Sequence, residues 1–249
     1  MDLSDYRLVF ADDFDGDELD LTHWDYRHTG PEGCGFNAPS QVRVEQGNLI
    51  LRYSYRTDGE FGEGWYGADL HLRKRYLRGY FEIRAICSDP YPGGFWSAFW
   101  LQARGPYTPE ISQGGPGGAE IDIIEAGRGR DKTPDFPGTP GVDANIHVTG
   151  MKNPPYTFEG HTTQHPYPMR VDIPDCYTAY HTYGLEWTEE VYRFYVDGRL
   201  FAETNWGDGV SEVDEEVCIS MCIPGTPPTD RSASSEFWVD YLRIYQKEA

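Results

Sequence analysis

The feature that most constrains the fold is a pattern of short strand-like runs, separated by turns, along the whole chain. Residues typical of strands fill these runs, and the 28 Gly and 18 Pro residues interrupt them. Long runs of helix-forming residues are missing. The pattern predicts an all-β fold of two stacked antiparallel sheets, a β-sandwich or jelly roll. The clearest predicted strands are Tyr6–Phe10, Gln41–Glu45, Asn48–Ser54, Arg78–Ile86, Phe95–Gln102, Ala119–Glu125, Tyr180–Trp187, Val191–Val196, Val217–Ile223 and Glu236–Tyr245.

Turns and loops within this pattern indicate where a site would lie. Asp197-Gly198 is typical of a two-residue type I′ hairpin, and Gln46–Asn48 predicts a second tight turn. Two segments rich in Gly and Pro, residues 104–118 and 127–141, flank the predicted strand Ala119–Glu125. Loops around one strand of a rigid sheet often carry a binding site. All-β chains of this length, 249 residues, often form one unit, so we expect a single domain over residues 1–249.

Charge and composition restrict the partners. The formal net charge of -20 would repel polyanions, so nucleic acid and anionic membranes are poor candidates for partners. A solvated, soluble surface is the first interpretation of this charge, and a neutral polymer as substrate is the second. No run is long and apolar enough to span a bilayer. The five cysteines are odd in number and lack metal-type spacing, so they do not settle the compartment. No signal peptide is recognisable, which leaves a trimmed secreted protein and a cytosolic one both open.

The segment Glu120–Glu125 (EIDIIE) is the most informative. Because side chains alternate along a strand, Glu120 and Asp122 share one face, whereas Glu125 would point into the core with isoleucines. A lone carboxylate there would cost several kcal/mol. One extra residue between Asp122 and Glu125, a β-bulge, would turn both intervening isoleucines inward and Glu125 outward. The sequence therefore predicts three carboxyls on one open face.

Paired carboxyls on one face suit glycoside hydrolysis. One carboxylate attacks the anomeric carbon while a carboxylic acid protonates the leaving oxygen, and retaining enzymes hold the two roughly 5–5.5 Å apart. An acidic solvated strand and a cation site built from three oxygens remain alternative interpretations. Other chemistries lack their motifs, since the chain has no nucleophile elbow and no phosphate-binding loop.

Several residues near this strand are candidates for substrate binding. Trp96 and Trp100 share one strand parity and could stack on successive sugars, although a core position for both is an alternative. His147 follows the carboxylates and could hydrogen-bond a sugar hydroxyl or Asp122, or be a structural histidine. Asn37 is a further candidate for substrate binding. His161 and the histidine four residues later are interpreted as loop residues because prolines follow them.

These segments together resemble glycoside hydrolase family 16 in its bulged form. The similarity covers nearly the whole chain, beginning with the carboxylate segment Glu120–Glu125. The other similar segments are Phe10–Asp15, Gln46–Leu51, Gly79–Arg84, Gly94–Trp100, His181–Trp187, Val196–Gly198 and Val239–Tyr245.

The resemblance implies a β-jelly-roll with an open substrate cleft on its concave face. We expect an enzyme that needs no cofactor for catalysis and is secreted, with a cytoplasmic location as the alternative. The resemblance implies Glu120 as nucleophile, Glu125 as general acid/base and Asp122 as the assisting carboxylate. It also implies a structural Ca²⁺ held by the Gly47 carbonyl and the Asp240 carboxylate, with an acidic residue near Asp13.

The resemblance leaves the substrate open. Laminarinases of this family commonly have a Ser-Gly-Arg run where the matching stretch of this chain is Gly67–Leu70, and Trp-Pro where it has Trp96-Ser97. The first hypothesis is an endo-β-1,3- or β-1,3-1,4-glucanase acting as a monomer on a polysaccharide. The second is an endo-acting galactanase or galactosidase for marine galactans or mucin-type glycans. The third is a carbohydrate-binding protein of the same fold that does no chemistry.

Overall fold

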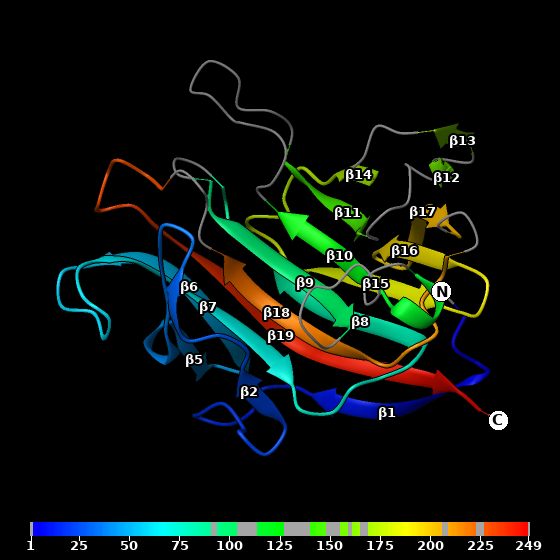
Figure 1. Cartoon of the computed structure of the whole chain (residues 1–249), viewed down its shortest axis with the longest axis horizontal. Helices are drawn as coiled ribbons and strands as arrows, with labels where there is room; N and C mark the ends of the chain where they lie inside the picture. The colour runs from blue at the N-terminus through cyan, green and yellow to red at the C-terminus, as the bar shows by residue number, and fades with distance from the viewer. Residues whose placement is uncertain are drawn as a thin grey trace.

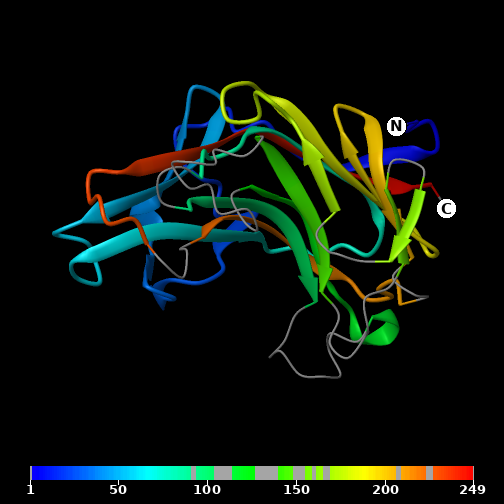
Figure 2. The same cartoon turned by 90° about the horizontal axis from the view of Figure 1, so that it is seen from above.

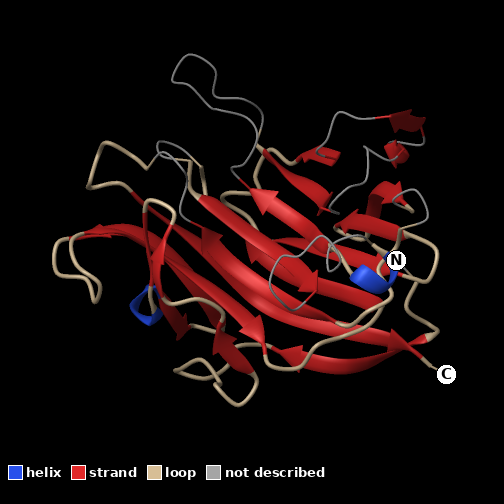
Figure 3. Ribbon diagram, viewed as in Figure 1, coloured by secondary structure: helices blue, strands red, loops and turns tan. Residues whose placement is uncertain are grey.

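The computed structural model describes residues 2–90, 94–103, 114–126, 140–147, 155–158, 161–164, 169–205, 209–222 and 227–248. Strands dominate these ranges, and the helical parts in them are two short 3₁₀ turns (Figure 3). The elements are β1 Tyr6–Asp12, β2 Trp24–Tyr26, β3 Gly30–Glu32, β4 Gly35–Asn37, η1 Pro39–Gln41, β5 Val42–Glu45, β6 Asn48–Arg56, β7 Gly64–Leu72, β8 Gly79–Ile86, β9 Trp96–Ala103, η2 Gly115–Gly117, β10 Glu120–Ala126, β11 Gly141–His147, β12 Pro155–Phe158, β13 His161–Gln164, β14 Met169–Asp172, β15 His181–Trp187, β16 Tyr192–Val196, β17 Arg199–Thr204, β18 Glu215–Cys222 and β19 Ser234–Lys247.

These strands form two layers, as predicted. The front sheet has the order β2-β7-β18-β9-β10-β11-β14, and every pairing in it is antiparallel. The back sheet has the order β5-β6-β19-β8-β15-β16-β17-β12-β13, with β1 also paired to β19. In Figure 1, β9 and β10 lie in front of β8 and β15, and Figure 2 shows the same two layers from above. Strand β7 also pairs with β6, so it joins the sheets.

The core lies between the two sheets. Phe99 and Ile121 of the front sheet and Phe81 and Ile83 of the back sheet are all buried in it. Because strand side chains alternate, the neighbours of Phe99 and Ile121 point to the opposite face of the front sheet. We call that opposite face the site face. It carries the polar and aromatic residues discussed below.

Both predicted tight turns are confirmed. Gln46 and Gly47 have φ values of 54° and 70°, and Asp197 and Gly198 have φ values of 50° and 71°. Positive φ at both central residues defines a type I′ turn, whose twist matches the flanking strands. These turns set the register of the β5–β6 and β16–β17 hairpins.

Other predictions need correction or lie outside the described residues. Strand β7, Gly64–Leu72, was not predicted, because its buried side chains fall on both faces and show no alternation. His161 begins β13 instead of lying in a loop. Residues 104–113 and 127–139 of the two predicted loops, and residue 165, are not among those described. Within the described part, no helix has the length and apolar character to cross a membrane.

Candidate active site

The predicted β-bulge is present in β10. In its pairing with β9, Asp122 lies opposite Trp100 and Ile124 lies opposite Phe99, so Ile123 has no partner. The register also shifts on the β11 side, between Asp122 and the glutamate three residues later. Ile123 and Ile124 are both buried in the core. The extra residue therefore lets two consecutive isoleucines face inward, as the sequence predicts.

The bulge places Glu120, Asp122 and Glu125 on the site face. Glu120 lies opposite Gln102 and Glu125 opposite Ala98, which share the face of Trp100 on β9. The prediction of an open row is nevertheless wrong for two of the three. The side chains of Glu120 and Asp122 are 20% and 4% exposed, and the residue Glu125 is 1% exposed.

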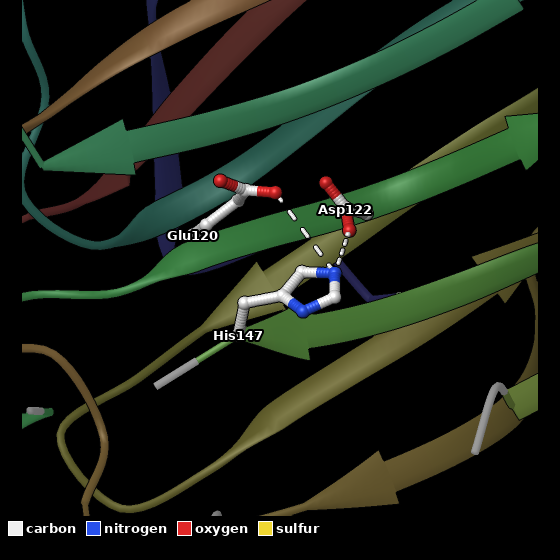
Figure 4. Close-up of side chains that lie close together, drawn as sticks. All are labelled: Glu120, Asp122 and His147. Atoms are coloured by element: carbon white, nitrogen blue, oxygen red, sulfur yellow. Dashed lines mark ion pairs between the residues drawn. The ribbon is translucent and has the colours of Figure 1, made fainter. Parts of the chain in front are cut away.

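His147 and Asn145 of β11 border the carboxylates on one side. His147 Nε2 lies 3.1 Å from Asp122 Oδ2 and 3.9 Å from Glu120 Oε1 (Figure 4). The predicted neighbourhood of His147 and Asp122 is therefore present. Asn145, which is not among the predicted site residues, donates its side-chain N–H to the Glu125 carboxylate. Its parity with His147 on the same strand was the signal that could have found it.

The same cluster could in principle hold a metal ion. Ligand atoms of Glu120, Asp122 and His147 all lie within 4.8 Å of one another. Two carboxylates and an imidazole are acceptable ligands for several divalent ions. They are equally the groups that acid–base and nucleophilic chemistry needs.

Gln102 and the tryptophans of β9 border the carboxylates on the other side. Gln102 Nε2 donates to Glu120 Oε2 at 2.7 Å. Trp96 and Trp100 are half-buried on the site face, so the alternative that both belong to the inter-sheet core is wrong. The Trp100 indole N–H donates to the Ser220 hydroxyl at 3.1 Å.

A partly buried ion-pair cluster lies beside Trp100, and the sequence does not predict it. The Arg27 guanidinium lies 4.6 Å from the centroid of the Trp100 ring. Arg27 Nη1 lies 3.4 Å from Asp69 Oδ2, and Nε lies 3.3 Å from Glu216 Oε2. Burial raises the pKa of Asp69 to about 6, although Arg27 acts in the opposite direction. Asp69 is one of the residues at which the sequence departs from the laminarinase pattern.

Asn37 is not brought into contact with the carboxylates by any described interaction. It ends β4, which runs parallel to β7 with Asn37 opposite Gly67. Its side chain is buried at 4% exposure, and its Oδ1 has no hydrogen-bond partner among the described residues.

The residues predicted to hold calcium lie at the β5–β6 turn and on β19. An oxygen of Asp15 lies 4.0 Å from where a Cβ on Gly47 would be, so a carboxylate is near the turn. Asp240 Oδ2, however, already accepts a hydrogen bond from Arg84 Nη1 at 2.7 Å. Asp13 is likewise paired with an arginine, at 3.1 Å. Oxygen ligands are present, but two of these carboxylates already have cationic partners.

Comparison with known proteins gives the chain a family. Residues 35–223 match the family described as Glycosyl hydrolases family 16. A β-glucanase of Rhodothermus marinus is 28% identical over 266 residues, covering 97% of this chain and 85% of the relative. β-Porphyranase E of Zobellia galactanivorans is 28% identical over 195 residues, covering 76% of this chain and 65% of the relative. The chain spans only about a third of several longer relatives.

A solved structure shows the same fold. It is a mutant of a non-specific endo-β-1,3(4)-glucanase from family GH16, with a 1,3-β-D-cellobiosyl-glucose at its active site. The TM-score is 0.72 at 22% identity, covering 98% of this chain and 96% of that chain. The family match extends over well more than half of the sequence and includes the carboxylate strand and its neighbours. The chain belongs to glycoside hydrolase family 16.

Proposed function

We propose that this chain is a retaining endo-acting glycosidase that cleaves internal β-1,3- or β-1,3-1,4-bonds of a glucan. The observation that carries the proposal is the bulge in β10, which puts Glu120, Asp122 and Glu125 on one face beside aromatic side chains. Similarity to the Rhodothermus marinus β-glucanase over nearly the whole chain supports a glucan substrate.

In this proposal Glu120 is the nucleophile and Glu125 the acid/base. Glu120 is the most exposed of the three acids, which suits a group that must contact the anomeric carbon. A carboxylate oxygen of Glu120 bonds to that carbon while the Glu125 carboxyl gives its proton to the glycosidic oxygen. The bond between the anomeric carbon and the glycosidic oxygen breaks, and the part of the glucan that carries this oxygen leaves. Glu125 then takes a proton from water, whose oxygen attacks the same carbon and releases Glu120. Two displacements at one carbon retain its configuration.

Asp122 and Asn145 would support these two groups. Asp122 lies between the glutamates along β10, and its carboxylate faces the His147 ring at 3.1 Å. A carboxyl close to Glu120 can share a proton with it before the glycosyl bond forms. The Asn145 amide holds the buried Glu125 carboxyl on the site face.

The test is the Glu120→Ala variant measured on laminarin and lichenan. We expect loss of hydrolysis with an unchanged fold, because Glu120 lies on the site face and outside the core. Adding azide should restore part of the turnover on an activated β-glycoside and yield the inverted glycosyl azide. Glu189→Ala is the matched control, because Glu189 is an exposed glutamate paired with Arg78 and is not one of the site residues. Near-normal turnover by Glu120→Ala would contradict the assignment, and so would the absence of any azide product.

A galactan or mucin-type glycan is the alternative substrate. Asp69, at which the sequence departs from the laminarinase pattern, lies on the site face paired with Arg27. β-Porphyranase E is also among the relatives. Product chromatography on laminarin, lichenan, agarose, porphyran and mucin glycans separates the two possibilities. A purely carbohydrate-binding protein would bind one of these and release no product from any.

We also propose that the protein works outside the cell, as a monomer with one catalytic domain. Its partner is a polysaccharide, and neither nucleic acid nor membranes are partners. The net charge of -20 supports a neutral polymer, since it would repel polyanionic surfaces. A polymer too large to enter a cell would have to meet the enzyme outside it. Trp96, Trp100, His147 and Asn37 are the proposed substrate-binding residues.

A structural Ca²⁺ at Gly47 and Asp240 is a separate proposal. The Asp15 carboxylate near Gly47 and the second oxygen of Asp240 support it, because Ca²⁺ prefers such oxygen ligands. The Arg84–Asp240 pair opposes it. A melting temperature that falls with EDTA and recovers with Ca²⁺, but not in Asp240→Asn, is the expected result. Identical melting with and without Ca²⁺ would rule the ion out.

A further inference from the structure

We propose that Gln102 is a positioning residue for the nucleophile, and that Arg27 fixes the orientation in which Gln102 does this. The inference rests on the proposed role of Glu120. It concerns two residues that are distant from Glu120 in the sequence: Arg27 directly follows β2, and Gln102 lies on β9.

The first observation is a short contact between Gln102 and the proposed nucleophile. Gln102 lies directly opposite Glu120 in the β9–β10 pairing. Its Nε2 donates to Glu120 Oε2 at 2.7 Å, and Gln102 itself is 7% exposed. A hydrogen bond from a buried amide to a carboxylate restricts the carboxylate to one orientation. The other oxygen, Oε1, lies 3.9 Å from His147 Nε2 and is then the one that attacks the anomeric carbon.

The second observation explains why the amide presents its N–H₂ group. A glutamine side chain can be rotated so that its oxygen and nitrogen exchange places. Arg27 removes this freedom, because a guanidinium only donates hydrogen bonds and its Nη2 donates to Gln102 Oε1. The nitrogen of Gln102 must therefore face Glu120. In the reversed orientation a carbonyl oxygen would face a carboxylate, which is repulsive.

The third observation is that Arg27 is itself held from several sides. Asp69 Oδ2 and Glu216 Oε2 lie 3.4 and 3.3 Å from its nitrogens, and the Trp100 ring lies beneath its guanidinium. The Arg27 side chain is only 27% exposed. Two acids thus fix the arginine, the arginine fixes the amide, and the amide fixes the nucleophile.

The test compares steady-state kinetics of Gln102→Leu, Arg27→Met and the double variant on the glucan that the wild type hydrolyses. Hydrogen bonds to charged groups are strong, so we expect Gln102→Leu to lower kcat by about tenfold to a hundredfold with little change in KM. Arg27→Met should lower kcat less, because the amide can still adopt the productive orientation part of the time. The double variant should be no slower than Gln102→Leu alone, since Arg27 acts through Gln102.

The pH dependence of Gln102→Glu tests the hydrogen bond itself, because a purely structural role of Gln102 would not change it. The introduced carboxyl can accept from Arg27, but it can donate to Glu120 only when protonated. Its activity relative to wild type should therefore rise as the pH falls. Arg43→Met is the matched control: Arg43 pairs with Glu236 at 2.9 Å and lies over the Trp238 ring, but on the back sheet. It should leave kcat unchanged.

Three results would overturn the inference: unchanged kcat in Gln102→Leu, additive losses in the double variant, or the same loss in Arg43→Met. Melting temperatures of all variants identify any that lose activity by unfolding, and Arg27→Lys then replaces Arg27→Met. Failure of the proposed function looks different. In that case wild type releases no product from any glucan, or Glu120→Ala remains active.

Discussion

Replacing Glu215 by glutamine should make the protein more stable in alkaline solution. Glu215 begins β18, is 0% exposed, and accepts a hydrogen bond from the Ala119 backbone N–H at 3.0 Å. Burial raises its pKa from 4.5 to about 8, although hydrogen bonds from Ser211 and Ala119 act in the opposite direction. Glu215 is therefore protonated in the folded protein at neutral pH. Glutamine has the same shape and keeps an oxygen for the Ala119 amide.

The raised pKa fixes the direction of the pH dependence. A carboxyl that binds its proton more tightly when folded contributes its full stability below about pH 4.5. That contribution is lost progressively as the pH rises towards 8, because the unfolded chain releases the proton first. The gap between the two pKa values corresponds to at most about 5 kcal/mol. Glu215→Gln cannot ionise, so it should lose this part of the pH dependence.

The assay is urea unfolding followed by tryptophan fluorescence, for both proteins, at intervals from pH 5 to pH 9. The free energies of unfolding should be similar at pH 5, and the variant should exceed wild type by several kcal/mol at pH 9. Asp69, whose pKa is about 6, titrates in both proteins and so cancels in the difference. Parallel pH curves for the two proteins would refute the reasoning, because they would mean that Glu215 does not titrate in this range.

The remaining predictions concern the site. Asp122→Asn should lower kcat less than Glu120→Ala does, because it keeps an oxygen near His147; an equal loss, measured on the same glucan, would mean that the roles are misassigned. Trp96→Ala should weaken oligosaccharide binding by roughly 1 kcal/mol or more in calorimetry, and unchanged affinity with a lower melting temperature would contradict stacking. Inserting an alanine after Ile124 should return Glu125 to the core and abolish both activity and the folded state, as circular dichroism would show.

The features that the sequence predicted are those set by neighbouring residues. Type I′ turns need residues that tolerate positive φ, so Asp197-Gly198 and Gln46-Gly47 identify their hairpins without any tertiary information. The bulge was predictable for a similar reason, since the order of acids and isoleucines in Glu120–Glu125 conflicts with plain alternation. Exposure was not predictable, because it depends on neighbours such as Asn145 and Trp100 on other strands.

The parts that were missed depend on contacts between distant segments. β7 contains glycines and an aspartate and shows no alternation, because it belongs to both sheets and is buried on both faces. Arg27, Asp69, Gln102 and Glu216 lie on four separate segments, and only the strand order brings them together. Their contacts are invisible to periodicity and spacing. Asp69 alone gave a signal, as a departure from the family pattern.

The bulge in β10 gives the buried Glu125 carboxyl a polar environment instead of an apolar one. On either face of β10 this carboxyl would be almost fully enclosed, so access to water does not distinguish the two orientations. The neighbours do. On the core side Glu125 would meet the isoleucines and phenylalanines between the sheets, which offer no hydrogen bond, and its burial would be uncompensated. On the site face it receives the Asn145 amide. The single extra residue therefore exchanges an apolar environment for a polar one, and it is this exchange that makes a buried glutamate tolerable beside Glu120.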